Sequence, residues 1–106
     1  MARILKIAAA QSGPIQKDEG RQAVVARLVE MMRQAASQES DIVVFTELAL
    51  TTFFPRYYEE DRSKMDEWFE TDMPGKVTQP LFDTAKKLGI GFSIGYAELT
   101  PDGHHF

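Results

Sequence analysis

One segment, Asp41-Ile42-Val43-Val44-Phe45-Thr46-Glu47, most restricts how this chain can fold. Its apolar residues are contiguous and mostly β-branched or aromatic, which is typical of a parallel-sheet strand that is covered on both faces. The strand ends in a glutamate, and an apolar loop closed by a proline follows at residues 48–55. Active sites of open α/β proteins gather at the carboxyl ends of such strands. The segment therefore predicts a buried strand over residues 42–47, with Glu47 in an apolar surround that suits proton transfer.

The segments around this strand predict an α/β fold. An apolar run at residues 4–10 predicts a first strand, and residues 90–96 predict a third. Between the first two strands, residues 21–38 carry apolar side chains at helical spacing on one face: Val24, Leu28, Met31 and Ala35. Strands that alternate with helices pair in parallel and form an α/β sheet.

A second helix is expected at residues 78–88. Thr78 is its predicted N-cap, Pro80 lies in the first turn, and Gly89 fits a left-handed C-terminal cap. The predicted buried face consists of Leu81, Ala85 and Leu88. Residues 55–70 are charge-rich and predict a loop with a short surface helix, and residues 101–103 predict the turn into a fourth strand.

Composition narrows the class of protein without naming a function. The chain has 106 residues, 43% of them hydrophobic, which suits one domain with a core. A net charge of −4 gives no basic patch for nucleic acid or an anionic membrane, and no apolar run is long enough for a membrane span. With no cysteine, these residues supply no disulfide, thiolate metal ligand or thiol nucleophile. We expect a cytoplasmic setting.

Residues 42–56, which run from the strand through Leu48-Ala49-Leu50 to Pro55-Arg56, resemble the glutamate motif of the nitrilase superfamily of carbon–nitrogen hydrolases. Within that superfamily they are most similar to the N-carbamoyl-D-amino acid amidohydrolases, or D-carbamoylases. Residues 10–15, 71–75 and 88–99 resemble further landmarks of the same family. The resemblance therefore extends over essentially the whole chain.

This resemblance implies a four-layer αββα sandwich, of which residues 1–106 would be the N-terminal portion, roughly the first third of a single domain. Family members use a Cys–Glu–Lys triad, and the glutamate falls on Glu47. The lysine and cysteine motifs lie further along the family's chain. The implied reaction converts an N-carbamoyl-D-amino acid and water to the D-amino acid, ammonia and carbon dioxide. It requires no metal or organic cofactor, and the intact protein is expected to be a homo-oligomer.

Two other functions are open at this point. The intact protein could be another amidase or ureidopropionase of the same superfamily, or the chain could be a non-catalytic α/β fragment that acts as an interaction module. The Cys-free composition favours the second for the isolated chain, which is expected to be inactive alone.

Five other side chains have competing interpretations. Phe53 and Phe54 suit either a substrate pocket or a structural role, as core or as a subunit contact. Glu98 could form a glycosidase-like acid pair with Glu47, although a hairpin residue beside the turn at 101–103 is favoured. His104 and His105 are adjacent, so in a strand they would point to opposite faces and not share a metal ion.

Overall fold

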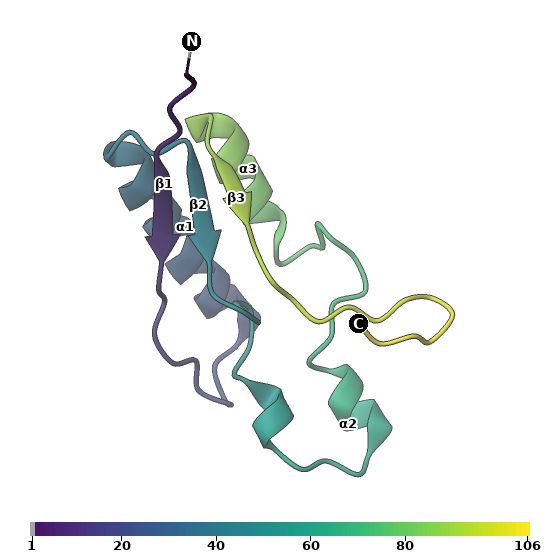
Figure 1. Ribbon diagram of the computed structural model, residues 1–106. Helices are drawn as coiled ribbons and strands as arrows, with labels where there is room; N and C mark the ends of the chain where they lie inside the picture. Colours follow the sequence, from purple (N-terminus) through teal and green to yellow (C-terminus); the bar gives the residue numbers. More distant parts are fainter. Residues whose placement is uncertain (1) are drawn as a thin grey trace.

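The computed structural model describes residues 2–106 and contains a parallel sheet of three strands in the order β1-β2-β3. The strands are β1 (Ile7–Ala10), β2 (Ile42–Phe45) and β3 (Gly91–Ser93). The central strand β2 pairs Ile42 with Ile7 on one side and with Gly91 on the other. Figure 1 shows the three arrows side by side and pointing the same way. The predicted α/β class and parallel pairing are confirmed.

Two helices cover one face of this sheet. Helix α1 (Arg21–Ser37) connects β1 to β2, and α3 (Gln79–Leu88) leads into β3. Both lie behind the sheet in Figure 1 and contact each other, as two right-handed parallel crossovers require. Helix α1 presents a continuous buried stripe to the sheet and to α3: Val24, Val25, Leu28, Val29, Met32 and Ala35. Met31 is only partly buried, because the stripe is centred on Leu28 and Met32.

The ends of α3 confirm one predicted cap and correct another. Gly89 ends the helix with a φ of 66°, in the left-handed region that glycine adopts without strain. Thr78 occupies the N-cap position but makes no capping bond; its hydroxyl instead accepts a hydrogen bond of 2.8 Å from the Gly75 N–H. Leu88, predicted on the buried face, is 40% exposed at the last turn, whereas Leu81 and Ala85 are buried.

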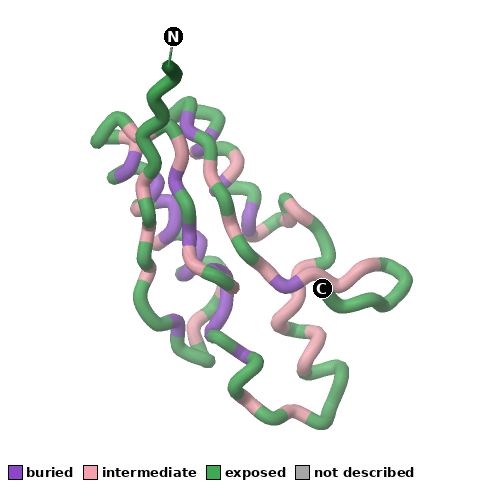
Figure 2. Tube along the Cα trace, in the orientation of Figure 1, coloured by how far each residue is buried: buried purple, intermediate pink, exposed green. Residues whose placement is uncertain are grey.

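The sheet has a buried face toward the helices and an open face on the other side. Side chains alternate between the faces, so Val43 and Phe45 are buried under the helices, whereas Val44 is 39% exposed and Ile7 59% exposed. Figure 2 shows this alternation along β2 and the buried segments of α1 behind it. The prediction of strands covered on both faces is therefore wrong for residues 2–106, in which both helices lie on the same side.

All three predicted strands are shorter than expected, and β2 ends two residues before its predicted end at residue 47. β1 begins at Ile7, and the preceding Ile4 is exposed; the backbone N–H of Lys6 already donates to the Asp41 carboxylate, at 2.8 Å, instead of continuing the ladder. β3 ends at Ser93 because its pairing with β2 spans only Ile42 to Val44. Strand length is thus set by the short central strand and not by the longer apolar runs.

The remaining segments lie beyond the carboxyl ends of β2 and β3 (Figure 1). They comprise the 3₁₀ helix η1 (Phe54–Arg56), helix α2 (Arg62–Asp66), and a hairpin with its turn at residues 101–103. Glu98 and Phe106 exchange backbone hydrogen bonds of 2.8 Å across this hairpin. The predicted turn is confirmed, but its fourth strand is reduced to an isolated bridge between Leu99 and His105. No helix within residues 2–106 has the length and apolar character to cross a bilayer.

Candidate active site

Glu47 lies in the turn that follows the central strand. β2 ends at Phe45, and after Thr46 the chain turns through Glu47–Leu50. Glu47 therefore lies just beyond the strand, whereas it was predicted to be the last residue of the strand. Leu48 has a φ of +47°, a left-handed conformation that costs a residue with a Cβ roughly 1–2 kcal/mol. The backbone N–H of Ala49 donates to the carbonyl of Gly95 at 3.0 Å, which fastens the turn to the segment after β3.

Gly95 brings these two segments into direct backbone contact. A Cβ built on Gly95 would lie 3.5 Å from the Leu48 nitrogen and 3.6 Å from the Glu47 Cα. A single carbon would therefore fill the available space, and a larger side chain would meet backbone atoms that have little freedom to move. The position of Glu47 is thus defined by the chain segments that leave two neighbouring parallel strands, which is the usual location of α/β sites.

A cavity of about 480 Å³ opens beside Glu47. Its lining comes from the turn after β2, the chain at the start of η1, the segment that follows α2, the segment after β3 and the end of the hairpin. The lining residues are Glu47, Leu48, Phe53, Phe54, Pro55, Phe69, Gly95, Tyr96, Ala97, His105 and Phe106. Most of these side chains are apolar or aromatic, and few are ionisable. This composition and volume are typical of small-molecule sites.

The two neighbouring phenylalanines have different environments. Phe53 is 49% exposed and forms an open part of the cavity wall. Phe54 is buried, lies 6.0 Å from the Trp68 ring in a stacked arrangement and 5.4 Å from the Phe69 ring, and also lines the cavity. Phe54 therefore serves both as core and as wall, and it explains why Trp68 and Phe69 are partly buried in a charge-rich segment.

Glu47 itself is exposed, although apolar side chains form the wall next to it. The full apolar surround that the sequence predicted is absent from residues 2–106, because Leu48 and the phenylalanines lie along the cavity and leave the glutamate open. No side chain or backbone N–H within this range donates to its carboxylate. Glu47 is thus available for contact with a ligand in the cavity.

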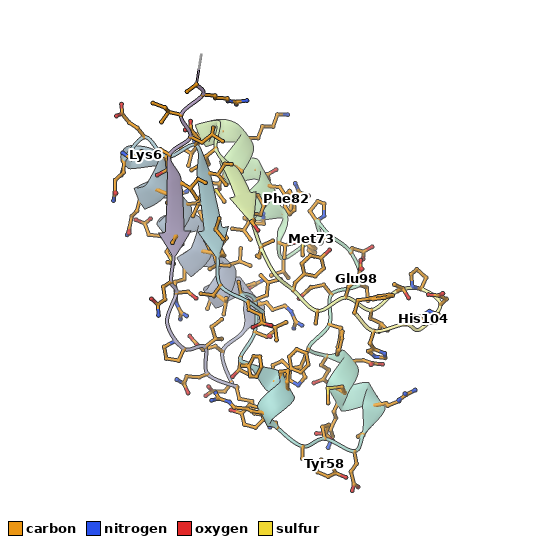
Figure 3. The ribbon with its side chains drawn as sticks, in the orientation of Figure 1. Lys6, Tyr58, Met73, Phe82, Glu98 and His104 are labelled. Atoms are coloured by element: carbon orange, nitrogen blue, oxygen red, sulfur yellow. The ribbon has the colours of Figure 1, made fainter. Side chains whose placement is uncertain are left out.

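His105 enters the cavity from the hairpin, which the sequence did not predict. Its Nε2 lies 2.6 Å from Asp66 Oδ1, and its ring meets the Phe69 ring edge-on, with 4.7 Å between centroids. His104 instead contacts Asp102 at 2.9 Å and lies far out on the hairpin in Figure 3. The predicted divergence of the two histidines is confirmed, but the hairpin register decides which one faces the cavity.

Asp102 orders the tip of the hairpin. The Thr100 hydroxyl and, after it, the His104 ring donate to this carboxylate and hold its pKa below the ordinary value. Glu98 lies at the base of the same hairpin, outside the cavity lining, so it forms no acid pair with Glu47 there (Figure 3). Within the described range, His, Asp and Glu residues form no group of three or more with the arrangement of a metal site.

A comparison with known families agrees with this geometry. The family model described as carbon–nitrogen hydrolase matches residues 6–105. The chain belongs to the carbon–nitrogen hydrolase family. The matched residues include Glu47 and every residue of the cavity lining except Phe106. The parallel sheet with helices on one face is consistent with the nitrilase-like α/β fold.

Proposed function

We propose that the complete gene product hydrolyses the carbamoyl group of N-carbamoyl-D-amino acids, with Glu47 as general base and then general acid. One observation carries this proposal: in a carbon–nitrogen hydrolase, Glu47 stands at the carboxyl end of the central strand and lines an aromatic cavity. The resemblance of residues 42–56 to the D-carbamoylase motif supports this substrate over a simple amide.

The chemistry assigns Glu47 a defined task. A thiol is only slightly ionised at neutral pH, so a neighbouring base must take its proton before it attacks a carbonyl carbon. The Glu47 carboxylate is exposed to the cavity and accepts no hydrogen bond from residues 2–106, so it is free to accept that proton. The cysteine, and the lysine that stabilises the oxyanion, would come from residues outside these 106.

The proposed steps balance without a cofactor. The thiolate forms a bond to the carbamoyl carbon, the bond from that carbon to the amino acid nitrogen breaks, and Glu47 returns the proton to that nitrogen as the D-amino acid departs. Glu47 then takes a proton from water, the resulting hydroxide attacks the same carbon, the carbon–sulfur bond breaks, and the departing sulfur takes the proton back from Glu47. The carbamic acid that this step releases breaks down to ammonia and carbon dioxide, so the products are the D-amino acid, ammonia and carbon dioxide. The aromatic rings of the cavity suit a substrate with an apolar side chain.

The experiment is a Glu47→Gln substitution in the complete gene product, assayed by ammonia release from N-carbamoyl-D-phenylalanine. Glutamine is nearly isosteric but takes no proton, so we expect kcat to fall by roughly 10²- to 10⁴-fold with the thermal unfolding temperature unchanged. Glu98→Gln is the matched control, because Glu98 lies outside the cavity lining, and it should leave kcat unchanged.

Two outcomes would contradict the proposal. Wild-type turnover by Glu47→Gln would remove Glu47 from the mechanism. An unmodified, folded protein that releases no ammonia from N-carbamoyl-D-phenylalanine, but does so from a simple amide, would replace the carbamoylase assignment by an amidase one.

A further inference from the structure

We propose that His105 binds the carboxylate of the substrate in the cavity that Glu47 lines, and thereby selects N-carbamoyl amino acids over uncharged carbamoyl compounds. This inference rests on the proposed function. It assigns a specificity role to a residue that the sequence analysis considered only as a metal ligand.

The charge distribution of the cavity is the first reason. Among its lining residues, Glu47 carries a carboxyl group and His105 an imidazole, and the phenol of Tyr96 is the other polar side chain. An N-carbamoyl amino acid brings an anionic carboxylate, which in an apolar cavity needs a charged or strongly donating partner. Glu47 would repel it. His105 is the lining residue that can become a cation.

The second reason is how His105 is held. A carboxylate only accepts hydrogen bonds, so the 2.6 Å contact with Asp66 places a proton on the His105 Nε2. The opposite edge of the ring carries Nδ1, which has no hydrogen-bond partner in the part of the chain that the structure describes. A protonated imidazole donates from both nitrogens, so one ring can serve Asp66 and a ligand carboxylate together.

The ring is also fixed in orientation before a ligand binds. Phe69 meets it edge-on at 4.7 Å, and the backbone bridge between Leu99 and His105 holds the residue in the hairpin. Fixing a donor in advance reduces the entropy that binding must overcome. Asp66, which contacts His105 and not the cavity, is therefore a positioning residue.

The geometry of the substrate explains why the position of its carboxylate matters for the carbamoyl group. In an N-carbamoyl amino acid the carboxyl carbon and the carbamoyl nitrogen are bonded to the same α carbon. A carboxylate held at His105 therefore restricts where the carbamoyl group lies relative to Glu47. The side chain on the α carbon would then contact the aromatic wall.

The test compares two substrates of the complete gene product that differ in the carboxylate: N-carbamoyl-D-phenylalanine and 2-phenylethylurea. In His105→Gln, the amide nitrogen can still donate to Asp66, but the positive charge is lost. We expect KM for the carboxylated substrate to rise roughly ten- to a hundred-fold with kcat little changed, as loss of a charged hydrogen bond implies. KM for 2-phenylethylurea should stay within about twofold, since that substrate makes no such contact.

Two further variants separate recognition from folding. His104→Gln removes the neighbouring histidine, which contacts Asp102 outside the cavity, and should leave both KM values unchanged. His105→Arg retains a cationic donor, so it should keep KM for N-carbamoyl-D-phenylalanine much closer to the wild-type value than His105→Gln does.

The inference is overturned if His105→Gln raises KM equally for both substrates, because its role would then be packing, or if it raises neither. Failure of the proposed function looks different, since the unmodified protein would hydrolyse neither compound. In that case calorimetric binding of 3-phenylpropionate decides the matter. Weaker binding to His105→Gln than to His104→Gln supports the carboxylate site, and equal binding refutes it.

Discussion

Gly95 offers a direct test of how the sheet positions Glu47. A Cβ at this residue would lie 3.5 Å from the Leu48 nitrogen and 3.6 Å from the Glu47 Cα, which is ordinary van der Waals contact. Gly95→Ala should therefore fold and work almost normally. Gly95→Val adds two γ carbons, and each stands about 1.5 Å beyond the Cβ. The valine leaves too little room for the backbone of the Glu47 turn.

The magnitude follows from these distances. Carbon atoms pack at about 3.5–4.0 Å, so the added carbons require the turn to retreat by roughly 0.5 Å. A displacement of 1 Å in a catalytic group costs about 10²-fold in rate, so half of it should cost roughly tenfold in kcat. Overpacking should also lower the free energy of unfolding by about 1–3 kcal/mol. The hydrogen bond from Ala49 to the Gly95 carbonyl, 3.0 Å long, would lengthen in the same variant.

The assay measures kcat for ammonia release from N-carbamoyl-D-phenylalanine by the wild type, Gly95→Ala and Gly95→Val, well below the unfolding temperature of each. A Gly95→Val kcat within twofold of the wild type would refute the reasoning that this contact positions Glu47. An equal loss in Gly95→Ala and Gly95→Val would also refute it, because the effect would then come from backbone freedom and not from space.

Two further predictions concern the framework around the cavity. Arg21→Met removes the guanidinium whose Nε lies 2.5 Å from Glu70 Oε1, and the Glu70 side chain, which is 15% exposed, loses its partner. We expect the free energy of unfolding, measured in urea, to fall by about 1–3 kcal/mol. A wild-type midpoint would contradict this. Thr100 and His104 hold the pKa of Asp102 below its ordinary value. The ionised Asp102 therefore stabilises the hairpin fully at a pH above the ordinary pKa, and this stabilisation is lost as the pH falls through the lowered pKa. A carbon NMR titration of Asp102 should show the lowered pKa, and Thr100→Val should raise it.

Local patterns in the sequence predicted the framework that holds the site. The contiguous run at residues 42–45 predicted β2, and the spacing from Val24 to Ala35 predicted α1 to within one residue. Gly89 marked the end of α3. These features are encoded within one element each, by side-chain periodicity or by a backbone conformation that one residue type favours, and for that reason a single sequence shows them.

The errors share a different origin. The lengths of β1 and β3 depend on pairing with the short strand β2. The residues at 4–6 and 94–96 do not by themselves indicate where β2 begins or ends. The exposure of Leu88 and Val44 depends on which face the helices cover. Such facts belong to the packing of segments far apart in the chain, so propensity and periodicity do not determine them.

The residues of the candidate site also differ in whether one segment predicts them or only the packing of distant segments does. Glu47 is found from the sequence because strand, carboxylate and apolar loop are contiguous. Gly95 and His105 are about 50 and 60 residues further along the chain. A glycine within an apolar run indicates a close backbone approach somewhere, but only the parallel pairing of β2 with β3 makes the Glu47 turn its partner. For the two histidines, alternation predicts that one side chain faces inward, and the bridge from Leu99 to His105 decides which. The residues that meet at the cavity are therefore specified by register, and a shift of the hairpin register by one residue should exchange His105 for His104 at the cavity.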